Sequence, residues 1–445
     1  MSNWRVTRAP LTGDFRSRWA RNRIVPVRSA NERNSHARDT TSPASGRGPR
    51  PGLTAMGDLV VLGLGYVGRP LADRAHAAGL SVVGVDSDPA VVAALDGGPF
   101  PVTTDPAAVS TADTVVICVP TGLVGGEPDL RAVVAAGRAV GDHLRPGALV
   151  VLESTSYPGT TEEVLLPLLE ARGLVAGVDF NLACSPERVD PGNAAFGLAN
   201  TPKVVSGLTP LCAKRCAAFY EQLVDEVVPA AGLREAEMAK LLENSYRLVN
   251  IALVNEVAVL CERLGVDVWD VLRCAGTKPF GFQAFRPGPG AGGHCIPVDP
   301  VYLSTRARAV GAPCAVVDAA RAVNSGMPAY VARRALDLLR GGGRVAGARV
   351  LVVGVTYKAD VADIRETPAE GVVRALRAAG ARVSYCDPLV PAFAVDGAEV
   401  PRVPEVGSGW DLVVLLQDHR GVRLGSPGPV LDTRGVLDGE DVHRL

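Results

Sequence analysis

The sequence predicts an α/β protein in which two Rossmann-like βαβ domains are joined by a central helical domain that contains one long helix. Three features predict this: a glycine-rich turn between apolar segments near residue 60, helical periodicity through residues 208–330, and further apolar segments after residue 345. A chain of 445 residues also exceeds the size at which one hydrophobic core keeps growing. We therefore expect a Rossmann domain at 56–207, the helical domain at 208–330 and a C-terminal Rossmann-like domain at 331–445.

The first domain opens with the pattern Gly-x-Gly-x-x-Gly, which follows an apolar strand-like segment and precedes a predicted helix. Gly63 makes the turn, Gly65 lets a pyrophosphate approach the backbone, and Gly68 packs the helix against the strand. Asp86 ends the next apolar segment, where a carboxylate accepts a hydrogen bond from the adenosine ribose 2′-hydroxyl and repels a 2′-phosphate. The sequence therefore predicts that NAD binds here in preference to NADP.

Polar residues follow the later predicted strands of this domain. The carboxyl ends of parallel strands meet at one edge of a doubly wound sheet, where such sheets bind ligands. Ser and Thr before a helix are also common as simple helix caps, and that alternative stays open for Thr121, Ser154 and Thr155. Glu187 follows another strand and is expected at the same edge. The expected cofactor contacts beyond the three glycines and Asp86 are Tyr66, Val67, Pro120, Thr121 and Ser154.

The longest predicted helix spans residues 234–264, where apolar residues recur at helical spacing. Lys240 and Asn244 stand one turn apart on this helix, so their side chains share a face. Such a pair is either part of a solvated surface or a cation and an amide directed at an oxyanion. The helix alone leaves both alternatives open.

Residues 286–300 form a loop of glycines and prolines around a single thiol, Cys295. This composition excludes a helix or a central strand, and it predicts a rigid loop that presents the thiol and lets a substrate approach the backbone. A nucleophilic Cys needs exposure and a lowered pKa. Asp299 is expected to return to the same site. The loop alone leaves open whether Cys295 is a nucleophile or a buried, inert thiol.

A second cofactor-like unit begins near residue 345, with an apolar strand at 349–354, a polar loop and a helix at 369–379. It lacks the Gly-x-Gly-x-x-Gly pattern. Its loop carries Lys358 and Arg365 instead, and these cations suit phosphates or a sugar nucleotide. The unit is therefore expected to bind a second ligand.

The rest of the composition excludes several classes of protein. Residues 1–55 hold eleven Arg and three acids, whereas the whole chain has a net charge of -1, so the body is mildly acidic and no nucleic-acid partner is expected. We expect the Arg-rich segment to be disordered and, because Met56 precedes the first strand, dispensable. Nine scattered Cys without a CxxC pair predict reduced thiols in the cytoplasm and no metal site. No apolar run reaches the ~20 residues of a membrane span.

Six short motifs together carry a resemblance to a known family. They are Gly63-x-Gly-Tyr-Val-Gly68, Val-Pro-Thr121, Ser-Pro-Glu187-Arg, Lys240-Leu-Leu-Glu-Asn244, Gly292-Gly-His-Cys295-Ile-Pro-Val-Asp299 and Tyr357-Lys358-x-Asp-x-x-Asp363-x-Arg365-Glu. In this order, across about residues 57–430, they resemble the UDP-glucose/UDP-N-acetylhexosamine 6-dehydrogenase family. His294 and Val298 stand where UDP-glucose enzymes typically have Ser and Lys. The chain looks closest to the enzymes of UDP-N-acetylglucosamine, ahead of those of the mannosamine epimer.

The resemblance implies a four-electron oxidation of the C6 alcohol of a UDP-sugar to a carboxylate, with two NAD and one water. It implies that Cys295 captures the intermediate aldehyde as a thiohemiacetal and then carries a thioester that water hydrolyses. Lys240 and Asn244 would stabilise the tetrahedral oxyanion. Without this covalent capture, a reactive aldehyde would escape between the two hydride transfers.

The resemblance also assigns the remaining residues. It gives proton transfer and water activation to Asp299 and Glu187, and it gives the holding of the water to Thr155. It implies a clamp on the NAD pyrophosphate at Arg365, and at least a homodimer. Two alternatives stay open: a two-electron dehydrogenase of the 6-phosphogluconate or hydroxyacid kind, with one NADH per sugar, and a sugar-nucleotide sensor without turnover. The implied substrate contacts are Arg286, Gly290, Gly292, His294 and Lys358.

Overall fold

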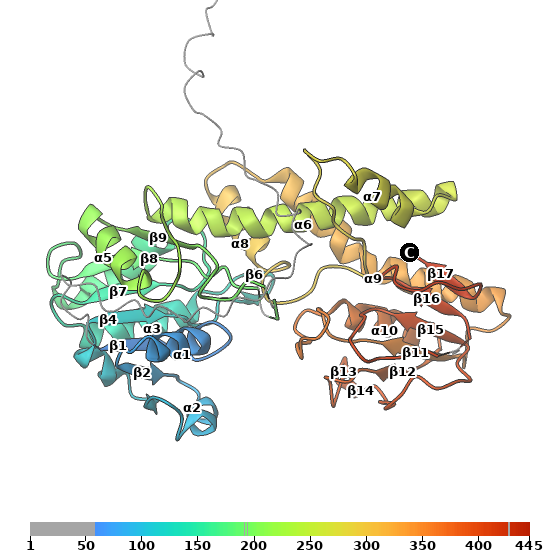
Figure 1. The fold of residues 1–445 in the computed structure, drawn as a ribbon, viewed down its shortest axis with the longest axis horizontal. Coiled ribbons are helices and arrows are strands. Elements are labelled where there is room, and N and C mark those ends of the chain that lie inside the picture. Colours follow the sequence, from blue (N-terminus) through green and yellow to red (C-terminus); the bar gives the residue numbers. More distant parts are fainter. Residues whose placement is uncertain (1–57, 191, 194, 426–427) are drawn as a thin grey trace, which may run out of the picture. The chain divides into compact units, whose positions relative to one another are not determined.

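Two mostly parallel sheets organise the described part of the chain, which comprises residues 58–190, 192–193, 195–425 and 428–445 of this computed structural model (Figure 1). The predicted α/β class is confirmed. The Arg-rich segment 1–55 lies outside the described residues. Residues 54–445 cluster as one unit by their contacts, so the predicted boundaries at 207 and 330 stay predictions.

The first sheet has the strand order β10-β9-β8-β7-β4-β1-β2-β3, and its neighbours are parallel except β8 with β9. Strand β1 lies between β2 and β4, with Leu59 in register with Val82 on one side and with Thr114 on the other. The strand order reverses at this point, which is where doubly wound sheets bind ligands. The strands are β1 (Leu59–Leu62), β2 (Val82–Val85), β3 (Val102–Thr103), β4 (Thr114–Ile117), β7 (Leu149–Leu152), β8 (Asn181–Cys184), β9 (Lys203–Gly207) and β10 (Val227–Pro229).

Both faces of this sheet are buried. Leu59 and Val61 pack in a core with α1 (Gly68–Ala77) and α5 (Pro210–Tyr220), whereas Val60 and Leu62 pack in a second core with α3 (Arg131–His143). This explains why the strands read as continuous apolar runs and not as alternating ones. Shorter elements complete this part: α2 (Pro89–Leu95), η1 (Pro106–Thr111), β5 (Leu123–Val124), β6 (Glu127–Pro128), η2 (Thr161–Leu165), α4 (Leu166–Leu169) and η3 (Glu170–Arg172).

Two long helices, α6 (Leu233–Leu264) and α9 (Ala315–Gly341), pack against each other. The helix predicted at 234–264 is therefore confirmed. Buried amides fix the contact, because Asn255 Nδ2 donates to Asn324 Oδ1 (2.9 Å) and Asn324 Nδ2 donates to the carbonyl of Leu248 (3.1 Å). Buried amides that are bonded in this way favour one register of the two helices. The shorter helices nearby are α7 (Val268–Gly276) and α8 (Asp299–Ala309).

The second sheet is wholly parallel, in the order β12-β11-β15-β16-β17. Val350 and Val352 face α9 and α10 (Pro368–Ala378), whereas Leu351 and Val353 pack against loop residues that include Trp410. Strand β11 lies between β12 and β15, so its carboxyl end is a second switch point. The strands here are β11 (Arg349–Val353), β12 (Arg382–Cys386), β15 (Leu412–Leu415), β16 (Val430–Asp432) and β17 (Val442–Arg444), and β13 (Ala394–Val395) pairs with β14 (Ala398–Glu399).

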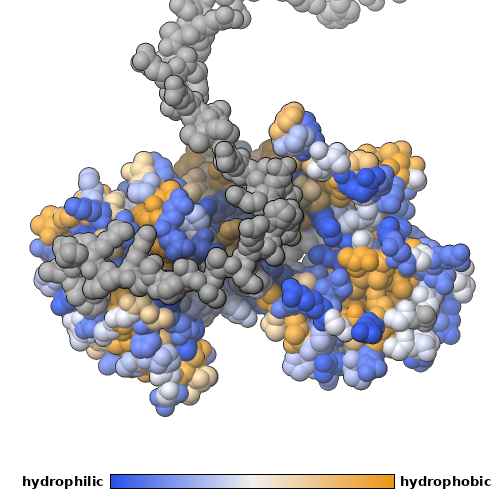
Figure 2. Space-filling view, in the orientation of Figure 1, coloured by the Kyte–Doolittle hydropathy of each residue, from blue (hydrophilic) through white to orange (hydrophobic). Residues whose placement is uncertain are grey.

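The surface is mixed in character. Figure 2 shows hydrophilic residues spread over the visible face of the described residues, interrupted by smaller apolar areas. Within the described part of the chain, none of the helices combines the length and the apolarity that a membrane crossing requires.

Candidate active site

The loop that carries Cys295 is held by contacts from the long helix α6 and from the segment that follows β11. The backbone N–H of Gly288 donates to Asn255 Oδ1 (2.9 Å), on α6, and the N–H of Gly293 donates to the carbonyl of Arg365 (3.0 Å). Gly293 has φ +87°, and a Cβ at this residue would lie 2.7 Å from the ring of Tyr357. Glycine is therefore required for this close packing. These contacts hold the part of the loop that precedes the thiol, and the rigidity of the loop stays a prediction.

Cys295 is exposed. Burial of part of its surroundings nevertheless raises the pKa of the thiol, and the Asp299 carboxylate acts in the same direction, whereas Lys240, Arg365 and Arg247 act against them. Desolvation therefore outweighs the three cations, and in this structure the thiol does not have the lowered pKa that a nucleophilic Cys needs. The thiol has to lose its proton as it attacks.

Lys240, Asn244 and Asp299 meet beside this thiol. Asn244 Nδ2 donates to Asp299 Oδ2, and the N–H of Asp299 donates to the carbonyl of Cys295 (2.9 Å). Asp299 is 2 % exposed, and this burial raises its pKa to about 6, although Lys240 and the Asn244 amide act in the opposite direction. Lys240 and Asn244, for which the sequence left two alternatives open, are therefore not part of a solvated surface. They lie next to a carboxyl group that titrates close to neutral pH.

The turn after β1 has the geometry that a dinucleotide requires. Gly63 has φ +86°, and a Cβ at Gly68 would lie 1.9 Å from the carbonyl oxygen of Gly63. A Cβ at Gly65 would meet nothing within 4 Å, which leaves space for a pyrophosphate. Asp86 accepts from the N–H of Leu64 (2.8 Å) and from the N–H of Asp88 (2.9 Å), so it also orders the turn. The residues present fit NAD.

Arg365 reaches this turn from the C-terminal part of the chain. Its guanidinium carbon lies 4.5 Å from the ring centroid of Tyr66, which is 58 % exposed. Asp363 orients the guanidinium through Arg365 Nε (3.0 Å) and Nη2 (2.6 Å). The Arg365 cation therefore lies over Tyr66 in the glycine-rich turn, for which the family resemblance implies a clamp on the NAD pyrophosphate.

The polar residues at the strand ends divide into different environments. Ser154 Oγ donates to the carbonyl of Val119 (2.7 Å) and so ties the ends of β7 and β4 together. Thr121 is buried and Thr155 is half-buried.

His294, a predicted substrate residue, approaches the same edge of the sheet, because a Cβ added at Gly122 would lie 3.9 Å from His294 Nε2. Burial and the Arg365 guanidinium lower the pKa of His294.

Glu187 belongs to a buried cluster that sequence reasoning missed. Lys203 Nζ donates to Glu187 Oε2 (2.8 Å) and to Glu153, and Tyr220 OH donates to Glu153 Oε2 (2.7 Å). Burial would raise the pKa of Glu187, but Lys203 and the N–H of Val189 lower it to about 2. Burial raises the pKa of Glu153 to about 8. Glu153 directly follows β7, so the expectation that polar residues after parallel strands lie at the ligand-binding edge also covers it. Lys203 belongs to no recognisable motif.

Lys358 lies at the other switch point and bonds across to the first part of the chain. Its Nζ donates to Asp190 Oδ1 (2.6 Å), three residues after Glu187. Tyr357, its neighbour, covers Gly292 and Gly293 of the cysteine loop. The structure therefore brings the predicted substrate residues of both regions together.

Arg434 is a further residue that sequence reasoning missed. It follows β16, and its Nη1 would lie 2.8 Å from a Cβ at Gly288, so it reaches the cysteine loop. Burial lowers the pKa of Arg434, and the nearby Arg286 cation acts in the same direction, whereas the Asp432 and Asp418 carboxylates act against them. Two neighbouring guanidinium groups favour an anionic ligand. The apolar segment that ends at Asp432 could have predicted β16, and with it the position of Arg434 after a strand, but this segment was not recognised as a strand.

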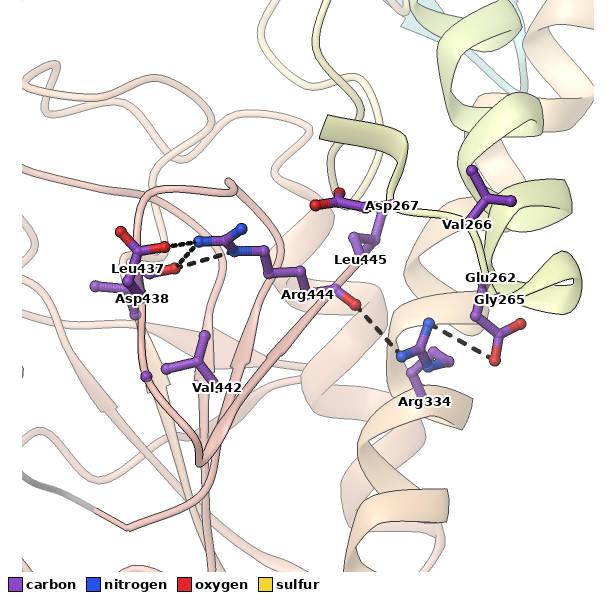
Figure 3. A pocket seen from close by; sticks show the side chains of 11 residues that line it. Glu262, Gly265, Val266, Asp267, Arg334, Leu437, Asp438, Val442, Arg444 and Leu445 are labelled. Atoms are coloured by element: carbon purple, nitrogen blue, oxygen red, sulfur yellow. Dashed lines mark hydrogen bonds and ion pairs between the residues drawn. The ribbon is translucent and has the colours of Figure 1, made fainter. Parts of the chain in front are cut away.

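A separate cavity of about 450 Å³ lies where α6, α9 and the C-terminal strand meet, and its described lining includes none of the predicted site residues (Figure 3). Figure 3 shows Arg334 between Glu262 (3.7 Å) and the carbonyl oxygen of Arg444 (3.3 Å). Its arginines are thus paired within the protein, and the cavity does not contain the chemistry described above.

Comparison with known families agrees with this geometry. Models of the UDP-glucose/GDP-mannose dehydrogenase family match the chain in three segments: the NAD binding domain at residues 96–224, the central domain at 234–326 and the UDP binding domain at 351–439. The chain belongs to this family. The predictions of an NAD-dependent dehydrogenase with an NAD-binding Rossmann domain are confirmed. The family match to the first domain begins after the glycine turn, so the geometry of that turn is separate support.

Relatives that match most of the chain are UDP-N-acetylhexosamine dehydrogenases. The UDP-N-acetyl-D-glucosamine 6-dehydrogenase of Pseudomonas aeruginosa is 37 % identical over 81 % of this chain and 90 % of its own. The UDP-N-acetyl-D-mannosamine dehydrogenase of Yersinia pestis is 32 % identical over 85 % and 98 %. Among solved structures, the UDP-D-ManNAc dehydrogenase of Pyrococcus horikoshii matches with a TM-score of 0.80 at 31 % identity, over 87 % of this chain and 98 % of its own.

Proposed function

We propose that the protein oxidises the C6 alcohol of UDP-N-acetylglucosamine to the carboxylate. The reaction consumes two NAD⁺ and one water and yields two NADH and three protons. NAD, when bound, supplies only the hydride acceptor for each oxidation. The observation that carries the proposal is the exposed thiol of Cys295 beside Lys240, Asn244 and Asp299, in a family member whose relatives are UDP-N-acetylhexosamine dehydrogenases.

In the first half of the reaction, C6 loses a hydride to NAD⁺ and its hydroxyl group loses a proton to solvent, and Cys295 attacks the aldehyde that results. The sulfur–carbon bond forms while the thiol proton passes to Asp299, which is largely ionised at neutral pH because its pKa is about 6. The resulting alkoxide is stabilised by the Lys240 ammonium and by the second N–H of the Asn244 amide, since the first N–H is bonded to Asp299. Loss of the C6 hydride then converts the thiohemiacetal into a thioester.

Hydrolysis of the thioester regenerates the enzyme. Water adds to C6, the sulfur–carbon bond breaks, and Cys295 recovers a proton. Although burial acts against it, the Lys203 ammonium lowers the pKa of Glu187, so its carboxylate is ionised and accepts a hydrogen bond from the attacking water, which Thr155 also holds. Asp299, with its pKa of about 6, first releases the thiol proton to solvent, then accepts a proton from the attacking water and returns one to the sulfur of Cys295 as the sulfur–carbon bond breaks.

The charged residues from both sheets suit the ligands of this reaction. Lys358 at one switch point and the Arg286 and Arg434 pair are suited to the diphosphate and sugar of the UDP-sugar. Arg365, placed over Tyr66, is suited to the NAD pyrophosphate. The nine cysteines all lie in the described residues and are free, which supports a reducing compartment such as the cytoplasm.

The test is an NADH-release assay with UDP-N-acetylglucosamine, UDP-N-acetylmannosamine, UDP-N-acetylgalactosamine and UDP-glucose in parallel. We expect the highest kcat/KM with UDP-N-acetylglucosamine and two NADH per sugar consumed. A preference for the mannosamine epimer or for UDP-glucose would change the substrate but keep the reaction. One NADH per sugar would point to a two-electron dehydrogenase and would overturn the covalent route.

We also infer a homodimer through α6. Its exposed apolar residues recur four and seven positions apart, which places them within about 80° of the helix circumference at 100° per residue. A stripe of this size on one helix suits a second copy of the same surface. Solution scattering checks this: wild type should be at least dimeric, Leu242→Glu with Leu253→Glu should shift it toward monomer, and a monomeric wild type would refute the inference. The exposed residues are Met238, Leu242, Tyr246, Leu253, Leu260 and Leu264.

A further inference from the structure

A buried histidine, His419, forms hydrogen bonds with the loop that carries Lys358. It follows β15 and is 2 % exposed. Its Nδ1 accepts a hydrogen bond from the backbone N–H of Asp360 (3.0 Å), so the ring proton belongs on Nε2. Nε2 lies 3.1 Å from Asp387 Oδ2 and 3.0 Å from Thr356 Oγ1. Both ring nitrogens are thus used, one as acceptor and one as donor.

The partners of His419 reach the same short segment from both sides. Thr356 Oγ1 donates to the carbonyl of Lys358 (2.9 Å), so its oxygen is available to accept from His419 Nε2. Asp387, at the end of β12, accepts the N–H of Val355 (2.7 Å) through the same carboxylate oxygen that faces the ring. The backbone around Lys358 is therefore fixed before and after that residue.

Asp360 shows that this segment is under local strain. Its φ is +61°, an unfavourable value for a residue other than glycine. The backbone N–H of Asp360 donates to His419 Nδ1. The Asp360 carboxylate accepts a hydrogen bond from the N–H of Arg420 (2.9 Å) and forms an ion pair with Arg420 Nε (2.9 Å). Such a conformation persists only where surrounding contacts determine it, and the buried contact is the one to His419.

The segment also supports the cysteine loop. Tyr357, between Thr356 and Lys358, packs against Gly292 and Gly293, two residues before Cys295. Lys358 itself bonds Asp190. A shift of this segment would therefore be transmitted both to the Lys358 ammonium and to the backbone that presents the thiol.

We propose that His419 is a positioning residue that fixes residues 355–360, so that Lys358 faces the UDP-sugar and Tyr357 supports the loop of Cys295. The part that concerns the UDP-sugar rests on the proposed function of Lys358. An imidazole with its ring proton on Nε2 supplies an acceptor to Asp360 on one side and a donor to Asp387 on the other. The charged groups around the ring are Asp387 from β12, Asp360 from the loop and Arg420 on the adjoining segment, with Arg402 bonded to the carbonyl of Asp387.

Two substitutions of His419 test the contributions of its two ring nitrogens separately. In His419→Gln the amide reaches the position of Nε2, keeps a donor for Asp387 and leaves the N–H of Asp360 without its acceptor. In His419→Asn the side-chain oxygen stands near the position of Nδ1 and keeps that acceptor. We expect His419→Gln to raise the Kd for the UDP-sugar about tenfold, with the Kd for NAD unchanged and a smaller effect in His419→Asn. The matched control is His443→Asn, at an exposed histidine on β17.

Two measurements without any sugar test the same inference independently. Hydrogen exchange of residues 355–360 should accelerate in His419→Gln. Alkylation of Cys295 should change in rate while alkylation of Cys274, an exposed thiol on α7, does not. If wild type fails to bind any UDP-sugar, the proposed function fails, yet these two measurements still decide the role of His419. Wild-type exchange and wild-type alkylation in His419→Gln would overturn the proposal.

Discussion

The side-chain amide of Asn244, on α6, donates a hydrogen bond to the carboxylate of Asp299, the first residue of α8. The N–H of Asp299 in turn donates to the carbonyl of Cys295 (2.9 Å). The long helix and the cysteine loop are therefore joined through one buried carboxyl group. Its protonation state links the stability of this region to the chemistry of the thiol.

Replacing Asp299 by Asn should stabilise the protein and inactivate it at the same time. Burial raises the pKa of Asp299 to about 6 from its ordinary 3.8, so the ionised carboxylate destabilises the folded state above pH 6, and this cost is relieved as the pH falls toward 4. By urea unfolding, Asp299→Asn should be more stable than wild type by about 2–3 kcal/mol at pH 7.5, with little difference at pH 4.

Turnover gives the complementary readout for Asp299. Wild-type kcat/KM should fall as the pH is lowered through about 6, because the protonated carboxyl group no longer accepts the thiol proton. Asp299→Asn should have low activity that lacks this inflection. A variant that is less stable than wild type at pH 7.5, or a stability difference that does not depend on pH, would contradict the buried carboxylate described here.

Replacing Cys295 by Ser should abolish formation of the acid and leave NAD binding intact. A serine hydroxyl is a far weaker nucleophile than a thiol, so the aldehyde is not captured and no thioester forms. Product analysis by mass spectrometry and NAD titration by fluorescence check the two halves of this prediction. Cys274→Ser, at the exposed thiol on α7, is the control and should retain wild-type activity. Normal acid output from Cys295→Ser would refute covalent catalysis.

Replacing Asp86 by Asn should weaken the discrimination against NADP. The charge that repels a 2′-phosphate is lost, while the amide oxygen still accepts one of the two backbone bonds now made to Leu64 and Asp88. We expect the ratio of kcat/KM for NAD over NADP to fall about tenfold. Asp88→Asn, at the N-cap of α2, controls for the loss of a nearby charge. An unchanged ratio would remove Asp86 from the ribose site.

Much of the fold could be predicted because local sequence carries it. Continuous apolar runs gave β1, β4, β7 and β11, since strands buried on both faces need no alternation. The glycine turn was recognisable because Gly63 and Gly68 are required by backbone contacts that any residue with a Cβ would disturb. The long helix followed from its periodicity.

The parts that escaped prediction depend on tertiary contacts. Lys203 begins an ordinary strand, and only folding brings its ammonium between Glu153 and Glu187. The pKa of Cys295 could not be inferred because sequence identifies the nearby cations but not the desolvation that outweighs them. His419 likewise carries no motif, and its role emerges only from bonds across the second sheet.

Replacing Arg434 by Gln should weaken binding of the UDP-sugar selectively. Arg434 lies against Gly288, and burial is the main cause that lowers its pKa, with Asp432 acting against it and Arg286 in the same direction, so an anionic ligand would offset the desolvation of this guanidinium. KM for the UDP-sugar should rise at least about tenfold, with KM for NAD unchanged. Because the removed cation is partly desolvated, the melting temperature should be equal to or above that of wild type. Arg382→Gln, at an exposed position on β12, is the charge-matched control. An unchanged KM for the UDP-sugar in Arg434→Gln would place the diphosphate elsewhere.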